Sequence, residues 1–375
     1  MGEPVCRACR GSTGHLVLDL GEQPACDYFP RSDDPGPDPT YPLQMWLCSS
    51  CGLAQLLTDP TVPEEPIGAE PTALVAQAAA AVARAGAAGL LPAGSQVVEY
   101  GSPHGGSWLG ELARCGLTPA SDGEPAGVVL DCFGLMHSPD QAAALAQRVA
   151  RVAPGGVLFL QYHSLETIIR LGQWNALRHG HYAYYSATAL AAMLAAQRFS
   201  PYLAWQFELY GGTVLLAARR EDDAAREPDG SVQRILADEA RTGVCDAAVL
   251  GGLQRQVETR AAGLRDWLTA ERSAGSTVLG YGAASRAIAL LCRAGANRSL
   301  LPAVADASPA KQGRRMPGTD IPVVSPARLA ADRPDAVLLF LADLLTEVRA
   351  AFPHVEAAGG RWVDADTLGS CQAGR

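Results

Sequence analysis

The chain has 375 residues, of which 48% are hydrophobic and 18% charged, and its formal net charge is −9. This length accommodates two or three domains that each bury a core, and the hydrophobic fraction excludes a disordered or collagen-like chain. The acidic balance, with no basic run, argues against nucleic acid as a partner. The alanine-rich stretches are too short or too interrupted by charge to span a bilayer, and cysteines stand where a signal peptide would be apolar. We therefore expect a soluble, cytoplasmic, monomeric protein of several domains.

Two CxxC pairs stand in the N-terminal segment, Cys6 with Cys9 and Cys48 with Cys51. Each pair can form a knuckle in which both sulfurs face one cation, and two knuckles complete a closed tetrahedral site of the structural type. The segment has too few apolar residues to fold on a core alone, so the metal would supply folding free energy. A redox CxxC follows a strand, opens a helix and would not come twice. We predict structural Zn²⁺ on these thiolates, in a module of residues 1–60.

Residues 61–220 are predicted to form a Rossmann-like domain. An apolar strand ends at Glu99 and runs into the glycine-rich turn Gly101–Gly106. The elements expected next alternate, as helix 107–115, strand 127–130, helix 138–152 and strand 156–161. Strands that alternate with helices predict a parallel sheet, and a glycine turn between the first strand and its helix is typical of nucleotide-binding folds. The candidate cofactor contacts are Glu99, Gly101, Ser102 and Gly105.

The same domain concentrates side chains that can move protons near neutral pH. They are His163, His179, His181, Tyr182, Tyr184, Tyr185 and Tyr210. Most of the tyrosines can equally be core aromatics with a hydrogen-bonded hydroxyl. His181 and Tyr210 each lie beside glycine in a predicted loop, which favours a role in a site for these two.

Residues 221–375 are predicted to begin with one or two long linking helices and to continue as a second Rossmann-like domain. Thr277–Arg286 opens a β–loop–α unit, and the next strand ends at Asp306. The loop Asp306–Thr319 is dense in hydrogen-bond donors, which suits phosphate or sugar hydroxyls; the alternative is a solvated surface turn. It contains Lys311, the one lysine among 30 basic residues.

Several motifs carry a resemblance that covers nearly the whole chain. They are CRAC from Cys6, LDLGEQP from Leu18, CxxCGLxQL from Cys48, EYGSPHG from Glu99, FGLMH ending at His137, HGHYAYYS from His179, YGGT from Tyr210, GYGA from Gly280 and SPxKQGRxxPGT from Ser308. In this order they resemble the zinc-containing, S-adenosylmethionine-dependent C-methyltransferases of deoxysugar biosynthesis. The resemblance implies a transferase of natural-product, including antibiotic, biosynthesis.

The resemblance also implies a mechanism by enolisation. A base removes the proton alpha to the 4-keto group of a nucleotide sugar, and the carbon then attacks the methyl sulfonium. His181 is the first choice as base because it keeps its family position, and Tyr210 stands where the family has a histidine and would donate to the enolate oxygen. The candidate catalytic residues are His181 and Tyr210, followed by His104 and His163, which are gains relative to the family pattern, and by His137. The expected substrate contacts are Tyr185, Lys311, Gln312, Arg314 and Thr319.

The chain departs from the family pattern at the cofactor site. The family's Asn-Asp in the glycine loop is Pro103-His104 here, and the glutamate of its His-Glu-His motif is Gly180. The stretch between Gly106 and Leu130 is too short for the second strand, whose acid binds the cofactor ribose, and for the helix and third strand that follow it. We therefore expect S-adenosylmethionine to bind weakly or not at all.

Three functions remain open at this stage. The first is a C-methyltransferase with a degenerate cofactor site. The second is an isomerase, epimerase, cyclase or decarboxylase that works on the same scaffold without a methyl donor. The third is a non-catalytic binding partner. For either enzyme, the expected substrate is a small molecule, such as a sugar nucleotide or a carrier-bound or polyketide intermediate.

Overall fold

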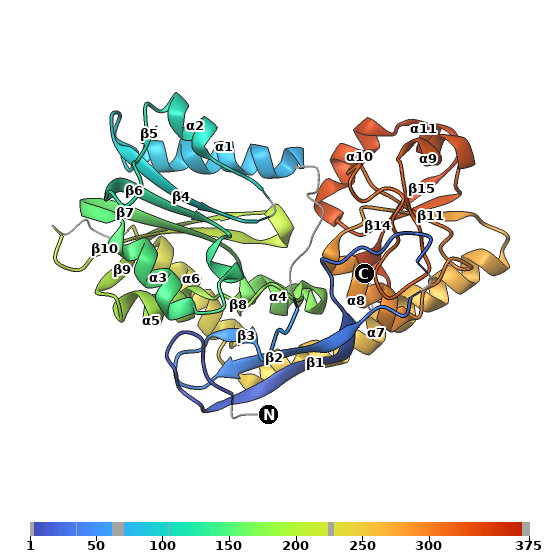
Figure 1. The fold of residues 1–375 in the computed structure, drawn as a ribbon, viewed down its shortest axis with the longest axis horizontal. Helices are drawn as coiled ribbons and strands as arrows, with labels where there is room; N and C mark the ends of the chain where they lie inside the picture. Colours follow the sequence, from blue (N-terminus) through green and yellow to red (C-terminus); the bar gives the residue numbers. More distant parts are fainter. Residues whose placement is uncertain (1–3, 35, 62–70, 104, 224–228, 370–375) are drawn as a thin grey trace.

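Three β-sheets organise the protein. The computed structural model describes residues 4–34, 36–61, 71–103, 105–223 and 229–369. The strand orders are β1-β2-β3-β8, β5-β4-β6-β7-β10-β9 and β13-β12-β11-β14-β15. In Figure 1 the second and third sheets lie side by side with their helices, and the blue N-terminal strands run below them. The predicted α/β architecture, a zinc module followed by two Rossmann-like domains, is confirmed.

The N-terminal sheet is antiparallel and borrows its last strand from the middle of the chain. Its strands are β1 (Gly14–Pro24), β2 (Thr40–Cys48), β3 (Ala54–Leu56) and β8 (Ala183–Tyr184). β3 pairs with β8 through Ala54 opposite Tyr184 and Gln55 opposite Ala183. The zinc module is therefore joined by backbone hydrogen bonds to the segment that carries His181, although the sequence places the two far apart.

The middle sheet is parallel at its centre and antiparallel at one edge. Its main strands are β4 (Gln96–Gly101), β6 (Ala126–Cys132), β7 (Val152–His163), β10 (Thr213–Arg220) and β9 (Phe199–Phe207). Its covering helices are α1 (Thr72–Ala87), α2 (Leu109–Arg114), α3 (Gln141–Ala150) and α5 (Ala187–Ala195). Val128 and Leu130 pack with α1 and α2, whereas Val129 packs with α3 and α5. Because both faces are covered, the central strands are continuously apolar.

The edge of this sheet next to β4 is short, as the sequence predicted. In place of a full second strand the structure has β5 (Thr118–Pro119), which pairs with β4 at Gln96 and Val97. Neither residue of β5, Thr118 or Pro119, is acidic. Among the described residues, this edge of the sheet is therefore a strand of two residues without a carboxylate.

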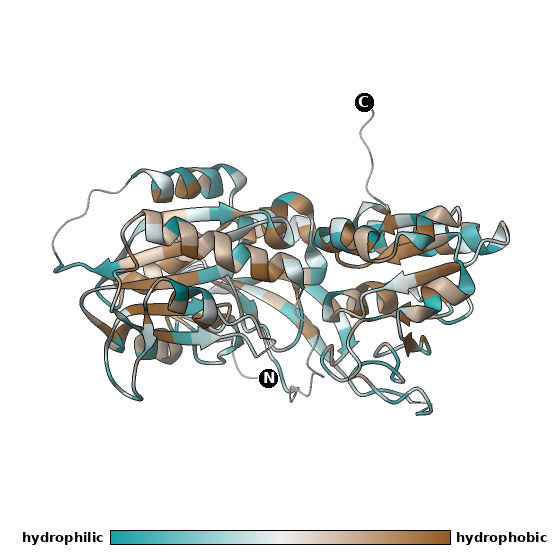
Figure 2. Ribbon diagram, turned by 90° about the horizontal axis from the view of Figure 1, so that it is seen from above, coloured by the Kyte–Doolittle hydropathy of each residue, from teal (hydrophilic) through white to brown (hydrophobic). Residues whose placement is uncertain are grey.

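The third sheet is parallel throughout. Its strands are β11 (Val278–Tyr281), β12 (Val304–Ala305), β13 (Val323–Val324), β14 (Ala336–Leu339) and β15 (Arg361–Asp364). Its helices are α8 (Ser285–Ala294), α9 (Ala327–Asp332), α10 (Leu345–Ala351) and α11 (His354–Ala357). Figure 2 shows hydrophobic, brown residues along the strands and helices of both Rossmann-like domains, whereas many turns are teal.

The expected linking region forms two helices, α6 (Ser231–Thr242) and α7 (Ala247–Ser273). α6 packs on the middle domain, where the buried Glu239 carboxylate accepts from the backbone N–H groups of Ala187 and Thr188. α7 shares one apolar core with β1, β2 and α8. By their packing, α6 lies with the middle sheet and α7 with the N-terminal strands and α8. Within the described residues, no helix combines the length and apolar character needed to cross a bilayer.

Candidate functional site

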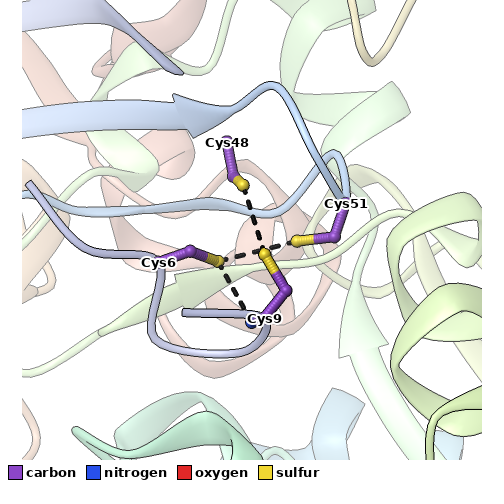
Figure 3. Close-up of side chains that lie close together, drawn as sticks. All are labelled: Cys6, Cys9, Cys48 and Cys51. Carbon is purple, nitrogen blue, oxygen red and sulfur yellow. Dashed lines mark hydrogen bonds between the residues drawn. The ribbon is translucent and has the colours of Figure 1, made fainter. Parts of the chain in front are cut away.

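The four predicted metal ligands converge at one end of the N-terminal sheet (Figure 3). The Sγ atoms of Cys6 and Cys51 lie 3.6 Å apart, as do those of Cys9 and Cys48, and all four sulfurs lie within 4.8 Å of one another. Zinc–sulfur bonds of about 2.3 Å in a tetrahedron place neighbouring sulfurs about 3.8 Å apart, so the cluster fits Zn²⁺. The first knuckle is stabilised by the N–H of Cys9, which points at Cys6 Sγ at 3.5 Å. This is a closed structural zinc cluster, and none of its cysteines lines the cavity described next.

A cavity of about 340 Å³ lies between the middle and C-terminal domains. It opens at the carboxyl ends of β4, β6 and β7 on one side and of β11 and β12 on the other, where parallel sheets bind their ligands. The predicted site residues that line it are His137, His163, His181, Tyr185, Tyr210, Ser102, Gly105 and Lys311. Side chains that the sequence spreads over much of the chain therefore meet in one place.

His181 lies in the loop before β8 and is held by an arginine that the sequence did not single out. The Nε of Arg178 lies 2.8 Å from His181 Nε2, and Arg178 Nη1 donates to the hydroxyl of Ser285 in the C-terminal domain. An imidazole nitrogen that accepts from a guanidinium carries no proton. The contact at Nε2 therefore requires a His181 ring without a proton on that nitrogen.

His137 ends the short helix η1 (Leu135–His137) and lies edge to face with His181, with ring centroids 4.7 Å apart. Its Nδ1 lies 3.0 Å from the carbonyl oxygen of Gly180. A carbonyl can only accept, so Nδ1 carries the proton and Nε2 is the nitrogen able to take one up. The two histidines thus form a close pair at the cavity wall.

His163 ends β7 and faces Tyr210, with ring centroids 6.3 Å apart. Burial, followed by the charge of Arg286, lowers the pKa of His163 to about 3. Its Nε2 is buried without a partner among the described atoms. At neutral pH this ring is uncharged, and its conjugate acid is too strong for it to be an effective base.

Tyr210 lies in the helical turn η3 (Leu209–Gly211) with φ +56°, a conformation unusual for a side chain of this size. Two glycines make the turn possible. A Cβ on Gly211, whose φ is +76°, would stand 2.8 Å from a Leu171 carbon, and one on Gly212 would stand 2.2 Å from Thr167 Oγ1. The Tyr-Gly-Gly motif is therefore a steric requirement for presenting Tyr210 to the cavity.

The C-terminal domain contributes charged groups beside Tyr210 that the sequence did not reveal. The Arg286 guanidinium carbon lies 6.0 Å from the centre of the Tyr210 ring. Asp343, in η4 (Ala342–Leu344), also lines the cavity. Burial raises the pKa of Asp343, although Arg286 and the backbone N–H groups of Tyr210 and Gly211 oppose the rise. No motif signalled these residues, because only the packing of two domains places them together.

The predicted cofactor contacts divide into two groups. Ser102 and Gly105 line the cavity. Glu99, in β4, instead bonds to the residues just before α2, where its carboxylate accepts from the Ser107 hydroxyl and the Trp108 N–H at 2.6 Å each. Neither Glu99 nor Gly101 is part of the cavity lining. The candidate His104 lies outside the described residues.

The predicted substrate contacts of the donor-rich loop also divide. Lys311 lines the cavity, with Nζ 3.0 Å from the carbonyl oxygen of Ala283 and over the Phe29 ring. The other three are not part of the cavity lining and bond to the backbone: Gln312 to Asp306, Arg314 to Phe29 and Ala310, and Thr319 to Met316. The structure therefore does not bring Gln312, Arg314 and Thr319 to the cavity.

Two tyrosine hydroxyls at the cavity wall already have protein partners. The Tyr185 hydroxyl donates to Gln141 Oε1, and that of Tyr184 bonds to the backbone of Arg178. Burial raises the pKa of both phenols, so neither ionises near neutral pH. Tyr185 thus lines the cavity, as predicted for a substrate contact, with its polar atom engaged elsewhere.

Three family profiles match the chain. They describe a zinc-binding domain at residues 6–65, a methyltransferase domain at 119–201 and a C-methyltransferase C-terminal domain at 208–365. The C-methyltransferase NovU of Streptomyces niveus is 26% identical over 232 residues, which cover 62% of this chain. The match spans about half of that relative, 54% of its length.

Solved structures of methyltransferases are also similar to part of the chain. One is magnesium protoporphyrin IX methyltransferase from Synechocystis PCC 6803 with bound SAH, at 16% identity over 39% of this chain and 82% of that one, with a TM-score of 0.29. Another is 1,6-didemethyltoxoflavin-N1-methyltransferase from Burkholderia thailandensis, at 15% identity over 45% and 95%, with a TM-score of 0.30. These scores are too low to inform the site.

Proposed function

Because the chain belongs to the family of zinc-containing C-methyltransferases, we propose that it enolises a ketone-bearing small molecule in natural-product biosynthesis and methylates the resulting carbon. The observation that supports this proposal is the cavity between the two Rossmann-like domains. It combines the glycine loop at the end of β4 with His137, His163, His181 and Tyr210. A carbon acid next to a carbonyl needs both a base and a donor to the oxygen, and this set supplies both.

Proton removal is assigned to His181. Its Nε2 accepts from Arg178 Nε at 2.8 Å, so this nitrogen carries no proton, and it takes the proton from carbon only after exchanging the Arg178 bond for the substrate. His137, whose ring centroid is 4.7 Å away, offers a second acceptor nitrogen beside it. His163 is not assigned this task, because a base with a pKa of about 3 has little driving force to take a proton from carbon.

Stabilisation of the enolate oxygen is assigned to Tyr210. The hydroxyl of a tyrosine can donate a hydrogen bond to a developing anion. The Arg286 guanidinium beside the Tyr210 ring adds positive charge at the same wall of the cavity. Lys311 and Arg178 also line the cavity and give it further cationic groups.

The methyl donor would lie along the glycine loop. Ser102 and Gly105 line the cavity there, and a Cβ added to Gly105 would meet nothing within 4 Å, so the backbone is open to a ligand. S-adenosylmethionine, when bound, supplies the methyl group. The cavity fits the ribose of this cofactor less well, because β5 contributes no carboxylate to the described lining of the cavity. Weak binding therefore remains our prediction.

That same edge favours a second candidate function. An enzyme that only moves protons, such as an isomerase, epimerase, cyclase or decarboxylase, needs the histidines and Tyr210 but no ribose-binding acid. The observation that favours this second function is that β5 has only two residues.

Proton and methyl transfer can be tested in one experiment. The zinc-loaded protein is incubated in D₂O with a 4-keto nucleotide sugar, with and without S-adenosylmethionine, and the products are analysed by mass spectrometry. We expect one deuteron to enter without the donor and one methyl group with it. His181→Ala should lower both rates by about 10²–10⁴-fold. His15→Ala, exposed on β1, is the matched control and should change neither. Exchange without methylation would favour the second candidate, and the absence of both would refute enolisation of this substrate class.

A further inference from the structure

We propose that Arg178 is a positioning residue that couples the orientation of the His181 imidazole to the docking of the C-terminal domain through Ser285. The inference rests on the proposed function in one respect, the role of His181 in proton transfer. The sequence patterns did not point to Arg178, because nearly all of the 30 basic residues in this chain are arginine. Its contacts make it stand out.

The backbone of Arg178 is anchored. Its N–H donates to the Tyr184 hydroxyl at 3.0 Å, and that hydroxyl lies 3.4 Å from the carbonyl oxygen of Arg178. Tyr184 is 2% exposed and belongs to β8, which is hydrogen-bonded to the N-terminal sheet. A buried anchor on both sides of one residue restricts where its side chain can extend. The Arg178 side chain extends to the cavity wall.

The guanidinium makes contacts toward two domains. Its Nε lies 2.8 Å from Nε2 of His181 in the middle domain, and its Nη1 donates to Oγ of Ser285 in the C-terminal domain. The N–H groups of a guanidinium are held in one planar fork, so the direction of one contact fixes that of the other. A displacement of Ser285 would therefore turn the guanidinium away from the imidazole that it holds.

The Ser285 end of this connection is rigid. Ser285 begins α8 and is 5% exposed. The loop before it is fixed at Ala283, whose N–H donates to Asp306 at 2.6 Å and whose carbonyl accepts from Lys311 Nζ at 3.0 Å. Arg178 is thus bonded to a fixed point of the C-terminal domain.

The consequence is that His181 is aligned only when both domains are in place. Displacing a reacting group by about 1 Å can cost roughly a hundredfold in rate. A bond that crosses the domain boundary at the proposed base therefore makes proton transfer depend on the C-terminal domain, although His181 itself belongs to the middle domain.

The test measures the ¹⁵N chemical shifts of the His181 ring by NMR, in the full-length zinc-loaded protein labelled with ¹⁵N-histidine. His181→Asn identifies the ring signals in long-range ¹H–¹⁵N spectra. In the wild type we expect a single state with Nε2 at the position of an unprotonated nitrogen. Ser285→Ala and Arg178→Leu should both move the ¹⁵N chemical shifts of the two ring nitrogens toward the values expected for a mixture of the two neutral tautomers. Arg178→Lys, which keeps a donor without the fork, should stay closer to the wild type than Arg178→Leu.

Matched controls separate this effect from a general loss of structure. Arg170→Leu removes an exposed arginine of α4 (Leu165–Leu171), and Ser273→Ala removes an exposed serine of α7; neither should change the His181 signals. Circular dichroism and zinc content verify folding. If Arg178→Leu fails to fold, Ser285→Ala decides. Unchanged His181 signals in Ser285→Ala would overturn the coupling.

A kinetic readout completes the test. Ser285→Ala should lower kcat about tenfold without changing KM, because it misaligns a group that acts after binding. A change in KM alone would place Ser285 in substrate binding and overturn the coupling. The spectra require neither substrate nor methyl donor. Absence of methyl transfer would therefore count against the proposed function and leave the result on Arg178 standing.

Discussion

The ion pair between Asp38 and Arg315 attaches the zinc module to the C-terminal domain, and its removal should destabilise the protein strongly. Both Asp38 oxygens accept from the Arg315 guanidinium at 2.6 Å, and one also accepts from the N–H of Gly318. The side chains are 6% and 7% exposed. Asp38 lies between β1 and β2, and Arg315 lies in the donor-rich loop that carries Lys311.

The magnitude follows from what Asp38→Ala would leave behind. Removing one partner of a buried ion pair costs about 3–5 kcal/mol, because the remaining charge is buried without compensation. Arg315 keeps two backbone acceptors, Asp34 O at 2.9 Å and Thr319 O at 3.1 Å, so we expect the lower end, about 3 kcal/mol. Arg315→Met should cost a similar amount. The double variant should lose much less than the sum, since no charge is then left unpaired.

The assay is urea unfolding of the four proteins of this double-mutant cycle, followed by intrinsic fluorescence. Asp33→Ala, which breaks the exposed pair with Arg31, is the control and should unfold like the wild type. Zinc content should stay unchanged, because Asp38 is not one of the ligands. A loss below about 1 kcal/mol in Asp38→Ala, or a coupling energy near zero, would refute the reasoning.

The same ion pair predicts a pH dependence. Burial would raise the pKa of Asp38, but Arg315 and the N–H of Gly318 outweigh it and hold this pKa below its ordinary value. A carboxyl group whose pKa is lowered by folding stabilises the protein above its unfolded pKa, about 3.9, and loses this contribution as the pH falls through its folded pKa. The stability difference between wild type and Asp38→Ala should therefore be full near neutral pH and shrink below about pH 4.

Three further predictions test the zinc cluster, the Tyr210 turn and the cofactor. The double variant Cys48→Ser/Cys51→Ser should retain no zinc by elemental analysis and should lose the fold of the N-terminal module, whereas full folding without metal would contradict a structural role. Gly212→Ala should lower the unfolding free energy by about 1–3 kcal/mol in urea titration, because its Cβ would stand 2.2 Å from Thr167 Oγ1; unchanged stability would show that the turn relaxes. S-adenosylmethionine should bind with a millimolar or weaker Kd, about −4 kcal/mol, in calorimetric titration, and micromolar binding would show that the short β5 edge does not limit the cofactor.

The sequence alone determined the features that local pattern and spacing control. The two CxxC pairs specified the zinc ligands, because four thiolates at such spacing satisfy one tetrahedral ion and little else. Alternating strands and helices specified two Rossmann-like domains, because periodicity and glycine turns are local signals. The short stretch before β6 predicted the reduced edge of the middle sheet, which the structure shows as β5.

Only the tertiary structure decided which side chains share the cavity. The donor-rich loop looked like one ligand site in the sequence, yet Lys311 faces the cavity while Arg314 bonds to the backbone of the N-terminal segment. Arg178 belongs to no motif, and its guanidinium donates to Ser285, which lies more than a hundred residues later in the chain. Local patterns report periodicity and turn chemistry. The direction of a side chain between two domains depends on long-range packing, which no stretch of sequence contains by itself.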